Sequence, residues 1–154
     1  MAFNELTPID WAVQTLLNSA EVTALVGNRI DADDNVPELL EGDDVRDYFP
    51  RLIYSGTPHG TPHATGLVLG WGEFLFTALC REDAVAPGAD LRESAVSIAQ
   101  AVEEALSLCP APGILGDGKT LHGAQLIDIF APPIYGPQGK RICARGRLFS
   151  LIWS

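Results

Sequence analysis

The sequence predicts an α+β fold, in which a mainly antiparallel sheet of about four strands carries helices packed on one face. Apolar residues recur at helical spacing in two segments, 9–17 and 91–106. Other segments have the apolar content or the alternation of strands, namely 51–55, 67–80, 120–130 and 140–153. Strands of high apolar content beside one long amphipathic helix indicate an α+β layer. The 154 residues fit a single domain, 1–154.

The first part of the chain is expected to be helical. Thr7-Pro8 supplies an N-cap and a proline suited to the first helical turn, and the apolar positions of the first segment follow. A second, short helix is expected over 21–26, where Val22, Leu25 and Val26 are apolar. Gly27 is placed to end it as a C-cap.

An acidic loop is expected at 31–47, because the segment has no clean period and includes a proline and a glycine. Eight acidic residues stand there against Arg46 alone: Asp31, Asp33, Asp34, Glu38, Glu41, Asp43, Asp44 and Asp47. The short strand at 51–55 is expected to lead into a hairpin loop at 56–66, which is rich in Gly, Pro, Thr and His. The next strand, 67–80, has an almost wholly apolar second half and is expected to be central, with both faces covered.

The best helix of the chain follows Pro87-Gly88. Asp90 and Glu93 have the spacing of a capping box, and one apolar stripe runs from Leu91 to Leu106. Two closing strands then flank a Pro/Gly turn at 131–139.

The last strand alternates with a period of two, which places Arg141, Arg145 and Arg147 on one face. The opposite face is small and apolar, so we expect that face to pack under a helix. The segment 118–154 forms a basic C-terminal hairpin, with five basic residues and Asp128 as its one acidic residue.

One motif suggests nucleotide chemistry. Gly113-Ile-Leu-Gly-Asp-Gly-Lys-Thr120 matches the phosphate-binding pattern G-x-x-x-x-G-K-[ST]. That chemistry needs a strand before the loop and a helix after it, whereas here a strand is expected to follow. A hairpin turn explains the segment better, and a small nucleotide-binding enzyme is kept as the alternative from another class.

Other chemical sites are not expected. His59 and His63 have metal-pair spacing, but glycine and proline between them exclude the helix that would bring them together. Asp31-x-Asp33-x-Asn35 opens like a calcium loop yet has Val36 and Gly42 where that loop needs glycine and glutamate. No spacing groups a nucleophile with a base, so we predict no catalytic residues, no metal and no cofactor.

Composition narrows the function further. The net charge of −10 disfavours ordinary nucleic-acid binding, because the field of the protein repels phosphate. The three cysteines lack a C-x-x-C pattern and favour reduced thiols in a protein made in the cytoplasm. No segment is apolar for long enough to span a membrane, and no signal peptide is visible. An acidic chain this apolar is expected to cover part of its surface in an assembly.

The order of these segments resembles the tail terminator, or tail completion, family of long-tailed bacteriophages. The resemblance is carried by the opening helix, by Ala24-Leu-Val-Gly-Asn-Arg-Ile30, and by Pro50-Arg-Leu-Ile-Tyr-Ser55. The strand at 74–80, the helix to Leu106 and the closing strand Arg147-Leu-Phe-Ser-Leu-Ile-Trp153 follow in family order. The longer acidic loop, the 56–66 loop and the extended 131–139 turn depart from it.

The resemblance implies a structural virion protein with no catalytic residues. Copies would form a ring, usually of six, that caps the tail tube at the head–tail junction, ends tube polymerisation and provides the docking surface for the head connector. Its partners would be itself, the tail tube protein and the connector or stopper protein, with DNA only as cargo passing through the lumen. Alternatives are another neck or head–tail joining protein, a minor tail protein, or a monomeric acidic binding module.

Charge placement suggests how copies could meet. Residues 1–50 hold eleven acidic and two basic residues, whereas the C-terminal hairpin is basic. Opposite patches on one chain permit a head-to-tail contact that closes into a ring. We therefore predict that Arg141, Arg145 and Arg147 face the acidic loop of a neighbour. The alternative for that loop is a position in the lumen, where it would repel DNA and let it slide.

Overall fold

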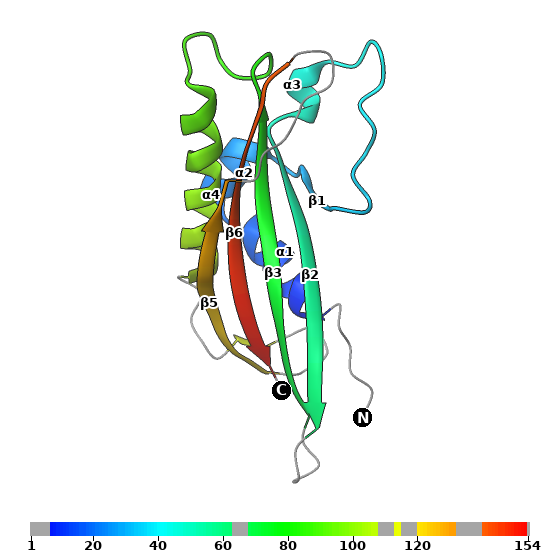
Figure 1. The fold of residues 1–154 in the computed structure, drawn as a ribbon, viewed down its shortest axis with the longest axis vertical. Helices are drawn as coiled ribbons and strands as arrows, with labels where there is room; N and C mark the ends of the chain where they lie inside the picture. The colour runs from blue at the N-terminus through cyan, green and yellow to red at the C-terminus, as the bar shows by residue number, and fades with distance from the viewer. Residues whose placement is uncertain (1–6, 63–67, 108–112, 115–119, 132–139, 154) are drawn as a thin grey trace.

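The computed structural model describes residues 7–62, 68–107, 113–114, 120–131 and 140–153. It is an α+β fold in which three helices lie behind one face of a twisted sheet (Figure 1). The four long strands are β2 (Arg51–Pro62), β3 (Val68–Arg81), β5 (Thr120–Phe130) and β6 (Ile142–Trp153). Short strands β1 (Ile30–Ala32) and β4 (Gly113–Ile114) flank them in the order β1-β2-β3-β6-β5-β4. The β1–β2 pair is parallel and the other pairs are antiparallel, so the predicted fold class is confirmed.

The helices begin and end at residues that local chemistry favours. They are α1 (Thr7–Leu17), α2 (Ala20–Val26) and α4 (Leu91–Ser107). Ser19 caps α2 by accepting a hydrogen bond from the Val22 amide, and Gly27 ends it with a φ of 61°, which glycine adopts without steric cost. Asp90 Oδ1 accepts the Glu93 amide at 3.0 Å and supplies one half of the predicted capping box of α4.

The core lies between the helices and one face of the sheet. Phe76 and Phe149 meet edge to face with ring centroids 6.2 Å apart, and Phe74 lies 6.4 Å from Trp153. These rings are buried against apolar side chains of all three helices, among them Leu16, Val22, Ile98, Val102 and Leu106.

The predicted orientation of the last strand was wrong. The odd-numbered residues of β6 face the helices, and the even-numbered residues lie on the other face. Phe149, Leu151 and Trp153 lie at odd positions and are fully buried, whereas the even-numbered Ile152 is exposed, so the largest apolar side chains set the orientation. Because a strand turns every second side chain to one face, Arg145 and Arg147 lie on the helix side of the sheet too, whereas Arg141 precedes the strand.

Two predicted loops hold regular structure. The acidic stretch includes the end of β1 and a four-residue helix, α3 (Val45–Tyr48), and β2 continues through most of the expected 56–66 loop to Pro62. The Leu52 amide donates to Arg29 and the Tyr54 carbonyl accepts from Asp33, so even-numbered residues of β2 turn their polar backbone groups away from β3. Pro58 and Pro62 therefore remove no hydrogen bond to β3. The rest of that loop, 63–67, and 132–139 of the predicted final turn lie outside the described residues.

The second face of the sheet has no layer of helices in the described residues, although Tyr48 of α3 lies against Arg51 at the start of β2. Leu75 and Leu79 of β3 point to that face and are only half-buried, although the sequence predicts cover on both faces of this strand. β3 is central, as predicted, because it lies between β2 and β6.

Candidate functional site

The acidic segment, residues 31–47, lies at the β1 side of the sheet, on the opposite side from β5 (Figure 1). Asp31 is half-buried and forms an ion pair with the buried Arg51, whose guanidinium also lies 4.3 Å from the centre of the Tyr48 ring. Asp31 is therefore a structural residue. The other seven predicted acidic residues are exposed, namely Asp33, Asp34, Glu38, Glu41, Asp43, Asp44 and Asp47.

Hydrogen bonds give the acidic segment a defined shape. Asp43 Oδ2 accepts the Leu40 amide at 2.9 Å, and the Asp43 amide donates to the Leu40 carbonyl at 3.1 Å. Asp44 caps α3 through the Arg46 amide, and the Tyr48 hydroxyl donates to the Pro37 carbonyl. The turn at 40–43 presents Leu40, 59% exposed, between carboxylates.

The three candidate arginines do not form one accessible face. Arg147 is 7% exposed, and its Nε donates to Glu103 Oε2 of α4 at 3.1 Å. Arg141 precedes β6, is exposed, and pairs with Glu82 at 3.2 Å. Hydrogen bonds from the backbone and side chain of Arg141 lower the pKa of Glu82. The predicted interface is therefore corrected: Arg147 is turned inward by the alternation of β6 and is already paired.

Arg145 has a different environment from the other two arginines. It is half-buried, and its Nη1 donates to the Ala144 carbonyl at 2.7 Å. Within the described ranges no carboxylate lies within ion-pair distance of it. Its β6 neighbour Gly146 pairs with Phe130, so Arg145 lies just beyond the end of β5.

Sequence reasoning missed three exposed apolar side chains at the end of β5, here called the apolar edge and made of Ile127, Ile129 and Phe130. The three exposed fractions are 48%, 59% and 42%. Ile129 pairs with Arg147 and Phe130 with Gly146, so these two side chains flank the strand on opposite faces of the sheet. A register shift between Leu126 and Asp128 interrupts the pairing with β6. Simple alternation predicts that Ile127 and Ile129 share one sheet face, and the sequence carries no clear signal for the irregularity that alters their positions.

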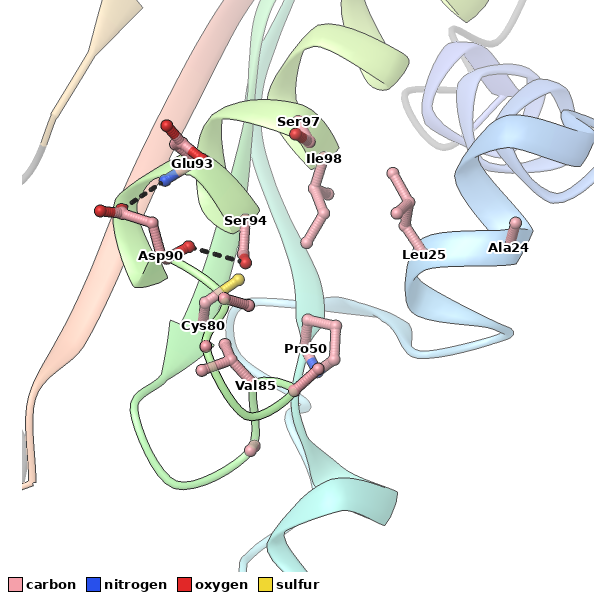
Figure 2. A pocket seen from close by; sticks show the side chains of 14 residues that line it. Ala24, Leu25, Pro50, Cys80, Val85, Asp90, Glu93, Ser94, Ser97 and Ile98 are labelled. Carbon is pink, nitrogen blue, oxygen red and sulfur yellow. Dashed lines mark hydrogen bonds between the residues drawn. The ribbon is translucent and has the colours of Figure 1, made fainter.

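A pocket of about 600 Å³ lies between α2, the first turns of α4 and the 84–90 loop. Figure 2 shows Leu25 of α2 and Ile98 of α4 on opposite sides of it, with Cys80, Val85 and Pro50 toward one end. Burial raises the pKa of Cys80 to about 12, so this thiol is protonated at neutral pH and is a poor nucleophile. Asp90 at the rim already accepts the Glu93 amide and the Ser94 hydroxyl through its side chain and carbonyl.

The described residues of the phosphate-binding motif lie in strands. Gly113–Ile114 pair antiparallel with Thr120–Leu121, and β5 follows where a phosphate site needs a helix. Residues 115–119 lie outside the described residues, as does His63.

Among the residues that the structure describes, no three potential ligands gather as a metal site requires. None of the described helices is long and apolar enough to cross a membrane.

No protein-family model and no curated protein matches the chain.

Proposed function

We propose that the chain is a structural protein of a phage virion, a tail terminator that forms a ring at the head–tail junction. The ring, a hexamer by resemblance, ends polymerisation of the tail tube and provides the surface on which the head connector docks. Its partners are further copies of itself, the tail tube protein and the connector. DNA passes through its lumen as cargo.

The observation that carries the proposal is the contact between the two motifs of the resemblance. Gly27 ends α2 and Arg29 then turns back, so that its Nε donates to the Pro50 carbonyl at 2.7 Å. The Leu52 amide donates to the Arg29 carbonyl, and Ile30 pairs with Leu52 in the parallel β1–β2 ladder. The motifs 24–30 and 50–55 thus form one structural unit, which is a reason for them to recur together.

Charge distribution supports the proposal in a second way. The acidic carboxylates are held on one side of the sheet by an ordered segment, rather than spread over the surface. Such a segment suits either repulsion of DNA in a lumen or contact with a cationic surface of a neighbour.

Assembly provides the test. The purified chain, alone and mixed with tail tubes of its own phage, is analysed by mass photometry and negative-stain microscopy. We expect rings whose mass is a multiple of 16.5 kDa, free or seated on one end of each tube. Addition of the chain to polymerising tube protein is expected to stop elongation. A protein that stays at monomer mass and neither caps nor shortens tubes overturns the proposal.

A further inference from the structure

The apolar edge of β5 is the largest concentration of exposed apolar side chains in the described residues. Of six exposed large hydrophobic residues there, three lie within four consecutive positions of β5, namely Ile127, Ile129 and Phe130. The other three are Leu25 on α2, Leu40 in the acidic segment and Ile152 on β6. Apolar side chains gathered in this way mark a contact surface more often than singly scattered ones do.

Backbone pairing between copies is disfavoured at both sides of the sheet. β5 carries two register shifts, between Leu121 and Gly123 and between Leu126 and Asp128, which disturb the row of amides along its free side. On β2, Pro58 and Pro62 lack amide protons at positions that face away from β3. A partner of the apolar edge must therefore be held by side chains.

Charge indicates which partner fits. Arg145 lies just beyond the end of β5 and is half-buried, and no carboxylate of the described residues lies within ion-pair distance of it. A half-buried guanidinium without a counter-ion gains from a carboxylate that arrives from outside. The exposed Leu40 is flanked by Glu38, Glu41 and Asp43. This turn therefore presents an apolar side chain together with carboxylates that can pair with Arg145.

We propose that the apolar edge of one copy packs on Leu40 of a second copy, with Arg145 paired to the carboxylates beside that leucine. The inference rests on the proposed ring and names its subunit contact. The two surfaces lie on opposite sides of the sheet, so the contact is head-to-tail (Figure 1). Head-to-tail contacts generate a ring when the rotation between copies closes.

Cross-linking tests the contact directly. Leu40→Cys and Ile129→Cys are made separately in a background with Cys109→Ser and Cys143→Ser, and the buried Cys80 stays. When the two proteins are mixed under mild oxidation, we expect a disulfide-linked dimer that contains one copy of each. The double variant is expected to give a ladder of linked multimers. A mixture that yields no mixed dimer under conditions where rings are present overturns the inference.

Substitutions test the energetics. Ile129→Ser and Leu40→Ser are each expected to raise the concentration for half-assembly at least about tenfold. Ile152→Ser, which removes a comparably exposed isoleucine outside the apolar edge, is the matched control and is expected to leave assembly unchanged. Arg145→Glu is expected to abolish rings, and the double variant Arg145→Glu with Glu41→Lys is expected to form them again. Arg92→Glu, at an exposed arginine of α4, is the charge-matched control and is expected to leave assembly unchanged. Circular dichroism confirms that each variant is folded.

The outcomes separate the inference from the proposed function. Rings that form in the wild type and also in Ile129→Ser, Leu40→Ser and Arg145→Glu overturn this contact but not the proposed ring. A wild-type chain that is monomeric alone and on its tail tubes overturns both.

Discussion

The Nε of Arg147 on β6 donates to Glu103 Oε2 on α4 at 3.1 Å, and this ion pair ties the longest helix to the middle of the sheet. Arg147 is almost fully buried, whereas the Glu103 side chain is partly open to solvent. Arg147 Nη1 also donates to the Gly146 carbonyl. The Arg147 guanidinium thus forms hydrogen bonds within the fold, and Glu103 is the carboxylate that balances its charge.

The first prediction concerns that dependence. Glu103→Ala leaves the buried guanidinium without a counter-ion and is expected to lower the free energy of unfolding by about 1–3 kcal/mol. Adding Arg147→Met is expected to recover most of the loss, because an apolar side chain of similar length fills the site without a charge. Urea denaturation measures both, and Glu104→Ala, an exposed neighbour on α4, is expected to change stability by less than about 0.5 kcal/mol. Equal losses of stability in Glu103→Ala and Glu104→Ala would show that the ion pair between Arg147 and Glu103 does not stabilise the fold.

The second prediction tests which face of β6 is buried. Trp153 is fully buried against Phe74, whereas its neighbour Ile152 is exposed on the other face. Trp153→Ala is expected to cost about 3–5 kcal/mol, and Ile152→Ala less than about 1 kcal/mol in the monomer. Thermal unfolding of the two variants measures the difference. The opposite order would return the strand to the orientation that the sequence predicts.

The sequence predicts the positions of strands and helices correctly where the hydrophobic periodicity and the capping residues agree. Apolar spacing, Gly27 and the Asp90–Glu93 pair locate α2 and α4 within a residue or two, and β5 has the predicted bounds. The orientation of β6 did not follow, because its odd face carries arginines at one end and large apolar residues at the other. Packing against α4 favours the apolar end, and Glu103 makes the burial of Arg147 tolerable. That carboxylate is 44 residues away, so local pattern does not show it.

The candidate site was less predictable for a similar reason. The acidic carboxylates are visible as a run in the sequence, and their exposure follows from charge. The apolar edge and the unpaired Arg145 depend on where β5 ends relative to β6 and on a register shift, both of which are set by pairing between strands. The length of β2 through 56–62 also comes from its pairing with β3, against a composition typical of a loop.

The third prediction uses two glycines in the sheet. A Cβ at Gly56 would lie 2.1 Å from Cδ1 of the buried Phe74, whereas a Cβ at Gly123 meets nothing within 4 Å. Gly56→Ala is therefore expected to destabilise the fold by about 1–3 kcal/mol, because the core ring must move. Gly123→Ala is expected to be neutral or slightly stabilising. Chemical denaturation of both variants measures the contrast, and equal stabilities would place Phe74 elsewhere.

The fourth prediction concerns alkaline pH. Burial raises the pKa of Cys80 to about 12 from a reference value of 9.0, so the folded state keeps the thiol protonated after the unfolded state has begun to ionise. This contribution to stability is complete below pH 9 and is lost as the pH rises from about 9 to about 12. Stability of the wild type and of Cys80→Ala is measured over that range. We expect the wild type to lose more stability than the variant, and parallel curves would contradict the shift.

The last prediction separates the structural proposal from nucleotide chemistry. Gly113–Ile114 and Thr120–Leu121 form an antiparallel pair, so the two described ends of the motif lie in paired strands. A phosphate site needs the amides of a helix N-terminus after the loop, and here β5 continues as a strand to Phe130. We therefore expect calorimetry with MgATP to give no binding heat, and Lys119→Ala to leave assembly and tube capping unchanged. Saturable heat that Lys119→Ala abolishes would instead assign the loop a phosphate ligand and favour the nucleotide-binding enzyme.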